Sequence, residues 1–214
     1  MLIKKIFLLS LVIIPISSYA EEFSIIIKSP SGKTIKDAVV TLSSKDNKKL
    51  QTGKTYKIDQ INKTYVPHVT IIPAGNNISF PNKDNIRHHV YSFSETKKFE
   101  LPLYEGTPTE PVTFNKSGIA VLGCNIHDWM RAYVFISDTP YYGLSGESGS
   151  VTIKNIPKGD YSLRVWHSRL KNQSDFKPTK IKVTSNQTHP YQATVALKPA
   201  FKIRRAPKAK RRKY

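Results

Sequence analysis

The sequence predicts an all-β protein, and three features of the chain support this prediction. Apolar residues recur at every second position in short runs, which is the spacing of a strand with one buried face. Tyrosine, phenylalanine, valine, isoleucine and threonine are frequent, and these residue types favour strands. Glycine, proline, asparagine and aspartate bound the runs, while long stretches of helix-forming residues are missing. We therefore expect β-sandwiches or barrels joined by turns.

The first 20 residues have the pattern of a secretory signal peptide. Lys4 and Lys5 supply the positive start, residues 6–16 supply a short apolar run, and Ser18-Tyr19-Ala20 supplies a cleavage site with small residues. The apolar run is short for a membrane span. We expect residues 1–20 to be removed and the mature protein to be soluble in the periplasm.

The charge and the cysteine count follow from this export prediction. The formal net charge is +19, and it becomes +17 once Lys4 and Lys5 are removed. An oxidising compartment favours disulfides, but Cys124 is the only cysteine and has no partner within the chain. An unpaired exported thiol is reactive unless something occupies it, and a metal ion would do so.

Runs of strand-like sequence occur near both ends of the mature chain, at 23–28, 38–42, 149–153, 161–166, 181–183 and 191–197. Two strands cannot bury a core alone, so the early runs need partners from elsewhere in the chain. We predict one sandwich whose first half is residues 21–59 and whose second half is residues 138–200. Residues 60–137 would then form a domain inserted between the two halves.

The two predicted halves carry motifs of a known sandwich. Pro157, Gly159 and Tyr161 form a Pro-x-Gly-x-Tyr turn, and Gly32 is followed by the apolar run that begins at Ala38. This pattern resembles the small β-sandwich of transthyretin-like and carboxypeptidase-regulatory-like domains. The resemblance implies the same sandwich architecture for these two segments.

The segment from Gly123 to Met130 carries most of the chemistry that the sequence offers. Cys124, His127 and Met130 supply a thiolate, an imidazole and a thioether within seven residues. Soft sulfur ligands together with imidazole favour copper, and a second histidine would complete a blue-copper ligand set. Zinc is the main rival metal, held by Cys124, two histidines and a carboxylate such as Asp128.

A strand predicted around residue 90 offers the second histidine. Neighbouring residues of a strand point to opposite faces, so only one of His88 and His89 can face the metal if the strand is regular. His88 shares its face with Val90, whereas His89 shares its face with Tyr91. A β-bulge could exchange the two, so His89 remains an alternative ligand.

Two motifs together resemble the cupredoxin family of plastocyanin, amicyanin and azurin. The first is aromatic-x-Asn-x-Asp-x-x-x-His-x-Val, from Phe80 to Val90, and the second is the Gly-Cys-x-x-His-x-x-Met segment. The wider likeness covers exported cupredoxin-domain proteins labelled methylamine utilization proteins. The resemblance implies a Greek-key β-sandwich over residues 60–137 that binds one type 1 copper ion. Its implied ligands are His88, Cys124, His127 and Met130.

Four further residues near these motifs are candidates for supporting roles. The family usually has asparagine at the position of His89, where the histidine could act as a hydrogen-bond donor behind the ligands. Asn82 and Asp128 are candidates for the same kind of support, and a negative charge on Asp128 would favour the oxidised ion. Trp129 either forms part of an apolar docking patch or packs to support the loop.

Other functional patterns are missing or weak. His68 and His167 lie at the edges of strand-like runs and are interpreted as structural histidines rather than a second metal site, and His189 lies in a polar loop. Neither a Ser-His-Asp set nor a pair of carboxylates stands out, and no glycine-rich phosphate loop occurs. We therefore do not expect an enzyme.

Residues 201–214 form a basic tail with eight lysines and arginines between residues 202 and 213 and no acidic residue. Such a segment is expected to be disordered, because like charges repel and few apolar groups are available for burial. It could solubilise the protein, or it could attract an acidic redox partner or an anionic membrane surface. Export argues against nucleic acid as a partner.

These observations lead to one predicted function and two alternatives. The predicted function is an exported type 1 copper protein that carries one electron between redox partners, such as a cytochrome or a dehydrogenase. The first alternative is copper storage or delivery with the same ligands. The second is an envelope- or carbohydrate-binding module in which the metal site is secondary.

Overall fold

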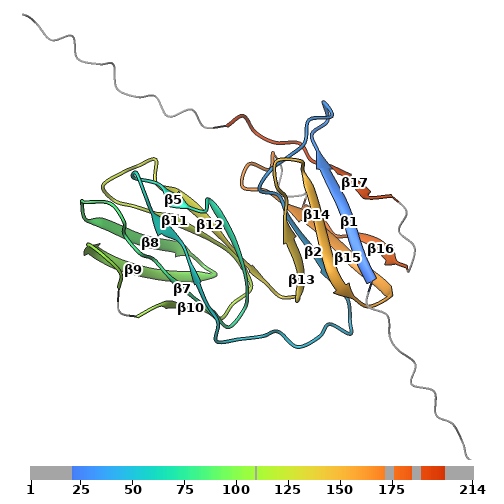
Figure 1. The fold of residues 1–214 in the computed structure, drawn as a ribbon, viewed down its shortest axis with the longest axis horizontal. Coiled ribbons are helices and arrows are strands. Elements are labelled where there is room, and N and C mark those ends of the chain that lie inside the picture. The colour runs from blue at the N-terminus through green and yellow to red at the C-terminus, as the bar shows by residue number, and fades with distance from the viewer. Residues whose placement is uncertain (1–20, 109, 172–175, 185–188, 201–214) are drawn as a thin grey trace, which may run out of the picture.

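The computed structural model describes residues 21–108, 110–171, 176–184 and 189–200. These residues form 17 β-strands and no α-helix (Figure 1), so the prediction of an all-β chain is confirmed. The predicted signal peptide and the basic tail lie outside the described residues. Within the described ranges there is no helix of the length and apolarity that a membrane span requires.

Two lobes lie side by side in Figure 1. The first, the sandwich lobe, has a three-stranded sheet in the order β14-β1-β17 and a four-stranded sheet in the order β13-β2-β15-β16. Its strands come from both ends of the described chain, because β1 pairs with β14 and β2 pairs with β15. They are β1 (Glu21–Lys28), β2 (Val39–Ser43), β13 (Tyr141–Leu144), β14 (Ser150–Ile156), β15 (Gly159–Trp166), β16 (Thr179–Val183) and β17 (Tyr191–Thr194).

The second, the middle lobe, contains a five-stranded sheet in the order β6-β12-β11-β8-β9, a three-stranded sheet in the order β10-β7-β3, and the small β4-β5 hairpin. It begins before residue 60, because β3 pairs with β7. Its strands are β3 (Thr55–Lys57), β4 (Asp59–Gln60), β5 (Tyr65–Val66), β6 (Val69–Pro73), β7 (Asn76–Ser79), β8 (His88–Ser94), β9 (Lys97–Tyr104), β10 (Val112–Phe114), β11 (Gly118–Gly123) and β12 (Arg131–Ser137).

Alternation along the strands gives each lobe its own core. In β1, Phe23, Ile25 and Ile27 are buried while their neighbours are more exposed. In the middle lobe, Ala120 and Leu122 of β11 point into the core, which also contains Val90 and Cys124.

The two lobes meet through aromatic side chains on the outer face of β12. Trp166 of the sandwich lobe lies with its ring centroid 5.7 Å from those of both Tyr133 and Phe135. Phe135 of β12 and Val69 of β6 belong to the core of the sandwich lobe, although both strands belong to the middle lobe. The outer face of β6 and β12 is therefore buried against the sandwich lobe.

Removing the Trp166 side chain tests how much this contact stabilises the protein. Trp166 is only 4% exposed, so Trp166→Ala should lower the free energy of unfolding by about 3–5 kcal/mol. Urea unfolding followed by circular dichroism measures the change. Leu144→Ala is the control, because Leu144 is 37% exposed and its loss should cost less than about 1 kcal/mol. A similarly small loss for Trp166→Ala would contradict the prediction.

Candidate metal centre

The chain brings two distant segments together at one end of the five-stranded sheet. His88 is the first residue of β8, and Cys124 follows directly after the last residue of β11. The two strands are antiparallel neighbours, with Tyr91 opposite Gly123, so the start of β8 lies beside the end of β11. His127 and Met130 lie in the connection from β11 to β12.

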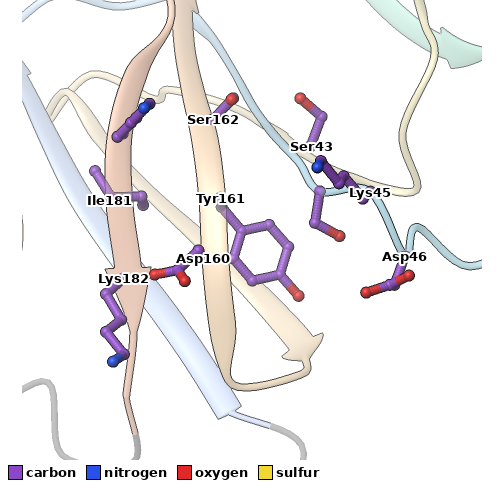
Figure 2. Close-up of a pocket in the computed structure, with 10 residues that line it drawn as sticks. Ser43, Lys45, Asp46, Asp160, Tyr161, Ser162, Ile181 and Lys182 are labelled. Atoms are coloured by element: carbon purple, nitrogen blue, oxygen red, sulfur yellow. The ribbon is translucent and has the colours of Figure 1, made fainter.

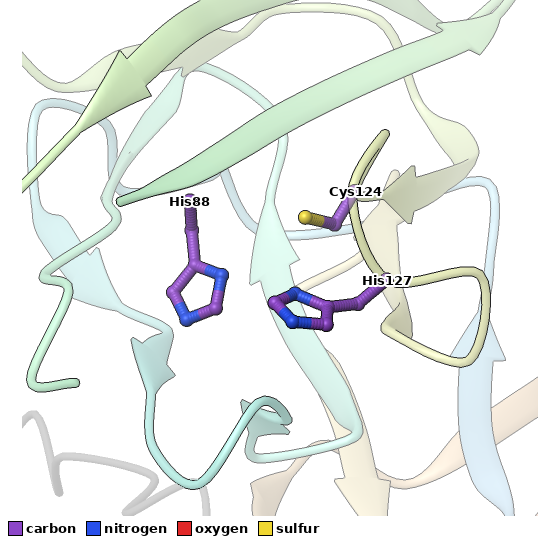
Figure 3. Close-up of side chains that lie close together, drawn as sticks. All are labelled: His88, Cys124 and His127. Atoms are coloured by element: carbon purple, nitrogen blue, oxygen red, sulfur yellow. The ribbon is translucent and has the colours of Figure 1, made fainter. Parts of the chain in front are cut away.

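Three potential metal ligands converge at this point. The ligand atoms of His88, Cys124 and His127 all lie within 4.8 Å of one another, and Figure 3 shows the three side chains facing one another. It is the one such group of histidine, cysteine and acidic side chains found in the described ranges. His88 is fully buried and Cys124 is 3% exposed.

The hydrogen bonding of the group fits a metal ion. The Nδ1 atoms of His88 and His127 are buried and have no hydrogen-bond partner, and Cys124 is a free thiol. Buried polar atoms in folded proteins nearly always have a partner, so two orphaned imidazole nitrogens beside one thiol call for an explanation. A metal ion bound by these three atoms would satisfy all of them.

Asp84 fixes the orientation of the His88 ring. The Nε2–H of His88 donates to Oδ2 of Asp84 over 2.8 Å, which leaves the Nδ1 lone pair free to bind a metal. Asp84 also accepts hydrogen bonds from the backbone N–H groups of Asn62, at 2.6 Å, and Lys63, at 2.8 Å. Sequence reasoning did not assign a role to Asp84, although its position four residues before His88 lies inside the first motif.

The hydrogen bonds to Asp84 determine its ionisation. Burial alone raises the pKa of this carboxyl, but the hydrogen bonds from Lys63, His88 and Asn62 together outweigh burial and hold the pKa below its usual value. The carboxylate therefore stabilises the folded chain at neutral pH. This stabilisation is lost as the pH falls through the lowered pKa.

A tight turn supplies the two backbone donors to Asp84. Asn62 and Lys63 have positive φ angles of 52° and 58°, and Ile61 and Thr64 form reciprocal backbone hydrogen bonds of 2.9 and 3.1 Å around them. These features define a two-residue hairpin turn of the type in which both central residues have φ above zero. Both central N–H groups are used to bind Asp84.

The same turn also holds the loop that carries the second histidine. The indole Nε1–H of Trp129 donates to the carbonyl oxygen of Lys63 over 3.1 Å, and the Trp129 ring lies 5.1 Å from the His127 ring. The Lys63 residue is thus linked to His88 through Asp84 and to His127 through Trp129. One turn restrains both imidazoles.

The loop from Cys124 to Met130 has two further restraints. The N–H of Met130 donates to the carbonyl oxygen of His127 over 2.9 Å, and the Met130 side chain, 1% exposed, belongs to the same core as Cys124. The hydroxyl of Tyr65 donates to the carbonyl oxygen of Gly123 over 2.8 Å and lies 3.4 Å from that of His89. Tyr65 therefore joins β8 to the residue that precedes the cysteine, a role that its sequence position does not signal.

The electrostatic environment keeps His127 neutral. Burial of its ring lowers the pKa of His127, the charges of His88 and Lys63 lower it further, and Asp84 opposes the change. A neutral imidazole is the form that binds a metal.

The remaining predicted site residues lie outside the three-ligand group. The Nε2 atom of His89 lies 2.8 Å from Glu100, and the ladder between β8 and β9 shifts register between His88 and Val90. Despite that shift, His88 faces the core and His89 is not part of the group. Asp128 is exposed at the surface of the loop.

Asn82 shapes the segment that leads to His88. Its side-chain amide donates to the carbonyl oxygens of Ile86 and Tyr104, and its Oδ1 accepts the backbone N–H of Asp84. Asn82 therefore positions Asp84 rather than a ligand.

The two histidines interpreted as structural have backbone partners. Nδ1 of His68 lies 3.1 Å from the carbonyl oxygen of Arg131, and Nδ1 of His167 accepts the N–H of Arg169 over 3.0 Å. Burial, together with the charges of Arg169 and His68, lowers the pKa of His167 to about 4. A hydrogen bond with the backbone of Lys36 raises this pKa and offsets part of the decrease. Neither histidine belongs to a metal-ligand group in the described ranges.

Comparisons with known proteins find neither a matching family model nor a matching curated protein. Among solved structures, the chain is similar to a Cu-containing nitrite reductase from Thermus scotoductus SA-01, with 22% identity and a TM-score of 0.36 over 38% of this chain and 22% of that one. It is also similar to a purple cupredoxin from Nitrosopumilus maritimus, with 22% identity and a TM-score of 0.34 over 38% of this chain and 98% of that one.

A reduced amicyanin variant shows a similar likeness, with 18% identity and a TM-score of 0.35 over 46% of this chain and 98% of the amicyanin. The chain thus spans about a fifth of the nitrite reductase and nearly all of the other two proteins.

Asp84→Asn tests the link between the carboxylate and the His88 ring. One amide oxygen cannot replace two carboxylate oxygens that accept three hydrogen bonds, so the preference of His88 for Nε2–H should weaken. Imidazole ¹⁵N chemical shifts of the metal-free protein should then show an increased share of the Nδ1–H tautomer, and stability should fall by about 2 kcal/mol.

Asp138→Asn is the control for Asp84→Asn, because Asp138 is 53% exposed and lies 3.8 Å from Arg164. It should leave both the tautomer and the stability unchanged. A His88 tautomer that is the same in wild type and Asp84→Asn would show that Asp84 does not orient the ring.

His167 should make the stability of the protein depend on pH. The unfolded chain binds a proton at this histidine below its ordinary pKa of 6.5, whereas the folded chain does so only near pH 4. Between these values the unfolded state holds the extra proton, so stability should decrease as the pH falls, by up to about 1.4 kcal/mol per pH unit. His167→Gln should flatten this part of the profile. His189→Gln, at an exposed position, should leave the profile as steep as in the wild type.

Proposed function

We propose that this chain is an exported type 1 copper protein that carries one electron at a time and catalyses no reaction of its own. The observation that carries the proposal is the group of His88, Cys124 and His127, whose ligand atoms lie within 4.8 Å of one another and whose two imidazoles each have a buried Nδ1 without a hydrogen-bond partner. Two nitrogens and one thiolate sulfur form the trigonal plane of a blue-copper site.

The donor set favours copper over zinc. No carboxylate oxygen belongs to the group, so the fourth ligand that a closed zinc site needs is missing among the grouped atoms. Met130 is buried in the core that contains Cys124, and a thioether there is suited to be the weak axial ligand of a single copper ion. Copper bound in this way would supply one-electron chemistry without any change in bonding.

The surroundings of the ligands support electron transfer. Fast transfer requires that the ligands move little when the charge of the ion changes. Asp84 and Trp129 are both hydrogen-bonded to the backbone of Lys63, and they restrain the two imidazoles. Strands β11 and β12, on either side of the loop, restrain Cys124. The protein thus provides a ligand cage that is already organised before the electron arrives.

The surface near His127 supports a role in contacting partners. His127 is partly exposed, and two apolar side chains of the same loop are accessible, Ile126 at 48% and Trp129 at 43%. Such a patch suits brief docking, with the electron passing through the His127 ring. The net charge of +17 that remains without residues 1–20 favours an acidic redox protein, such as a cytochrome or a dehydrogenase, or an anionic membrane surface. Residues 1–20 support a periplasmic location.

Copper storage or delivery would use the same ligands. A storage protein has to release its ion, whereas the buried thiol and the restrained imidazoles favour retention. Reversible one-electron cycling of the copper-loaded protein distinguishes a carrier from a storage protein, which would bind Cu(I) tightly and cycle slowly.

One feature of the sandwich lobe favours a binding module as a second candidate function. A hollow of about 890 Å³ lies beside β15 and β16, and Figure 2 shows Ser43, Lys45, Asp160 and Lys182 among its lining residues. Hydroxyl and charged groups of this kind could bind a polysaccharide of the cell envelope. In that case, removing copper would leave binding to the envelope unchanged.

The optical spectrum of the purified protein with Cu(II) tests the proposed function. A thiolate bound to Cu(II) should give an intense charge-transfer band in the visible range, and Cys124→Ser should abolish this band. Leu144→Ala, an exposed substitution in the sandwich lobe, should leave the band unchanged. A colourless wild-type protein that binds Cu(II) no more tightly than Cys124→Ser would refute a type 1 site.

A further inference from the structure

The outer face of the five-stranded sheet is covered by the sandwich lobe over only part of its width. Ile119, Tyr133 and Phe135 pack against the sandwich core. On β8 and β11 the same face remains open to solvent, and there Phe93 is 71% exposed and Val121 is 37% exposed. We call this open part the aromatic face; it consists of Tyr91, Phe93, Val121 and Arg131.

Aromatic rings follow one another along the aromatic face. The ring of Tyr91 lies 5.6 Å from that of His89 and 4.8 Å from that of Phe93. A hollow of about 300 Å³ beside them is lined by Tyr91, Phe93, Val121 and Arg131, among others. An exposed phenylalanine beside such a hollow is the kind of anchor that protein interfaces use.

The row of rings reaches the residue next to the thiolate. Gly123 is paired with Tyr91, and a Cβ atom placed on Gly123 would lie only 2.5 Å from Cζ of Tyr91. The Tyr91 ring thus occupies the space that a side chain at position 123 would need. Gly123 is bonded directly to Cys124, so the ring lies against the backbone that leads to the sulfur.

The charges around the aromatic face select an acidic partner. Arg131 lines the hollow, and Lys98 lies opposite Phe93 on the neighbouring strand. The carboxylate of Glu100, opposite Tyr91 on β9, accepts a hydrogen bond from Nε2 of His89 over 2.8 Å. The net charge of +17 that remains without residues 1–20 makes a second copy of this chain unfavourable, because two such molecules repel each other.

We propose that the aromatic face is a docking surface for an acidic redox protein, separate from the surface at His127. This inference rests on the proposed copper site. With copper held by Cys124, a reduced partner on this face would lose one electron and the ion would gain it, and Tyr91 and Gly123 lie between the aromatic face and the thiolate. No covalent bond forms or breaks, and no proton is transferred. The protein can then contact a donor and an acceptor at different surfaces.

Reduced flavodoxin, an acidic one-electron donor, is a suitable probe for stopped-flow kinetics with the Cu(II)-loaded protein. Phe93→Ala should lower the second-order rate constant about tenfold, because an anchor side chain is lost. Arg131→Glu should lower it by a similar factor and weaken its salt dependence. Tyr91→Leu should lower both the second-order rate constant and the limiting rate at saturating flavodoxin, because the ring lines the hollow and lies against the backbone that leads to Cys124.

Two variants serve as matched controls on the sandwich lobe. Leu144→Ala removes an apolar side chain that is 37% exposed, and Lys154→Glu reverses an exposed charge on β14. Both should react within about twofold of the wild type. Rates of Phe93→Ala and Tyr91→Leu that are also within twofold would overturn the inference.

A metal-free readout separates this inference from the proposed copper site. Oxidised flavodoxin added to the ¹⁵N-labelled protein without copper should shift the amide resonances of Phe93, Val121 and Arg131. Shifts confined to other surfaces would overturn the docking surface. A protein that shows these shifts but gives no charge-transfer band with Cu(II) would retain the docking surface and lose the copper site. A coloured protein that is reduced by dithionite but not by flavodoxin would retain the copper site and lose the docking surface.

Discussion

The antiparallel pairing of β8 with β11 is the constraint on which the site depends. It places Tyr91 opposite Gly123, so that the start of one strand and the end of the other meet at the same edge of the sheet. His88 and Cys124 reach each other only because of this register. A shift by one residue would turn His88 away from the core and present His89 in its place. The hydroxyl of Tyr65 bonds Gly123 and lies near the carbonyl oxygen of His89, which helps to hold the register.

Hydrogen bonds then convert this proximity into a defined geometry. An imidazole can rotate and can exchange its proton between two nitrogens, so a histidine near a thiol is not yet a ligand. Asp84 removes this freedom at His88, and the turn at Asn62 and Lys63 holds Asp84 with two backbone donors. The carbonyl oxygen of Lys63 receives the Trp129 indole, which packs beside His127. The rigidity of both histidines therefore depends on one hairpin turn that contributes no ligand.

The buried strands and the grouping of His88, Cys124 and His127 could be predicted from the sequence, because alternation and residue spacing are local signals. The strands that were not predicted, β3, β4, β5, β9, β10 and β13, lie at sheet edges, where one backbone side lacks a partner. β9 even contains Pro102, which normally argues against a strand but is tolerated at an edge. Lys63 contacts Asp84, which is 21 positions further along the chain, and Tyr65 contacts Gly123, which is 58 positions further along. No local sequence pattern reveals such contacts.

The outer face of the five-stranded sheet is covered by the sandwich lobe at one part and left exposed at another. An apolar sheet face is stable when it is covered, as it is where Tyr133 and Phe135 meet Trp166. The same face is left uncovered at Tyr91 and Phe93, where burial against the sandwich lobe would have contributed further stability. Simple stabilisation of the fold does not account for an exposed phenylalanine beside the strand end that carries the thiol. The proposed transient partner would account for it, because a protein that exchanges electrons with a partner has to present an apolar contact and release it again.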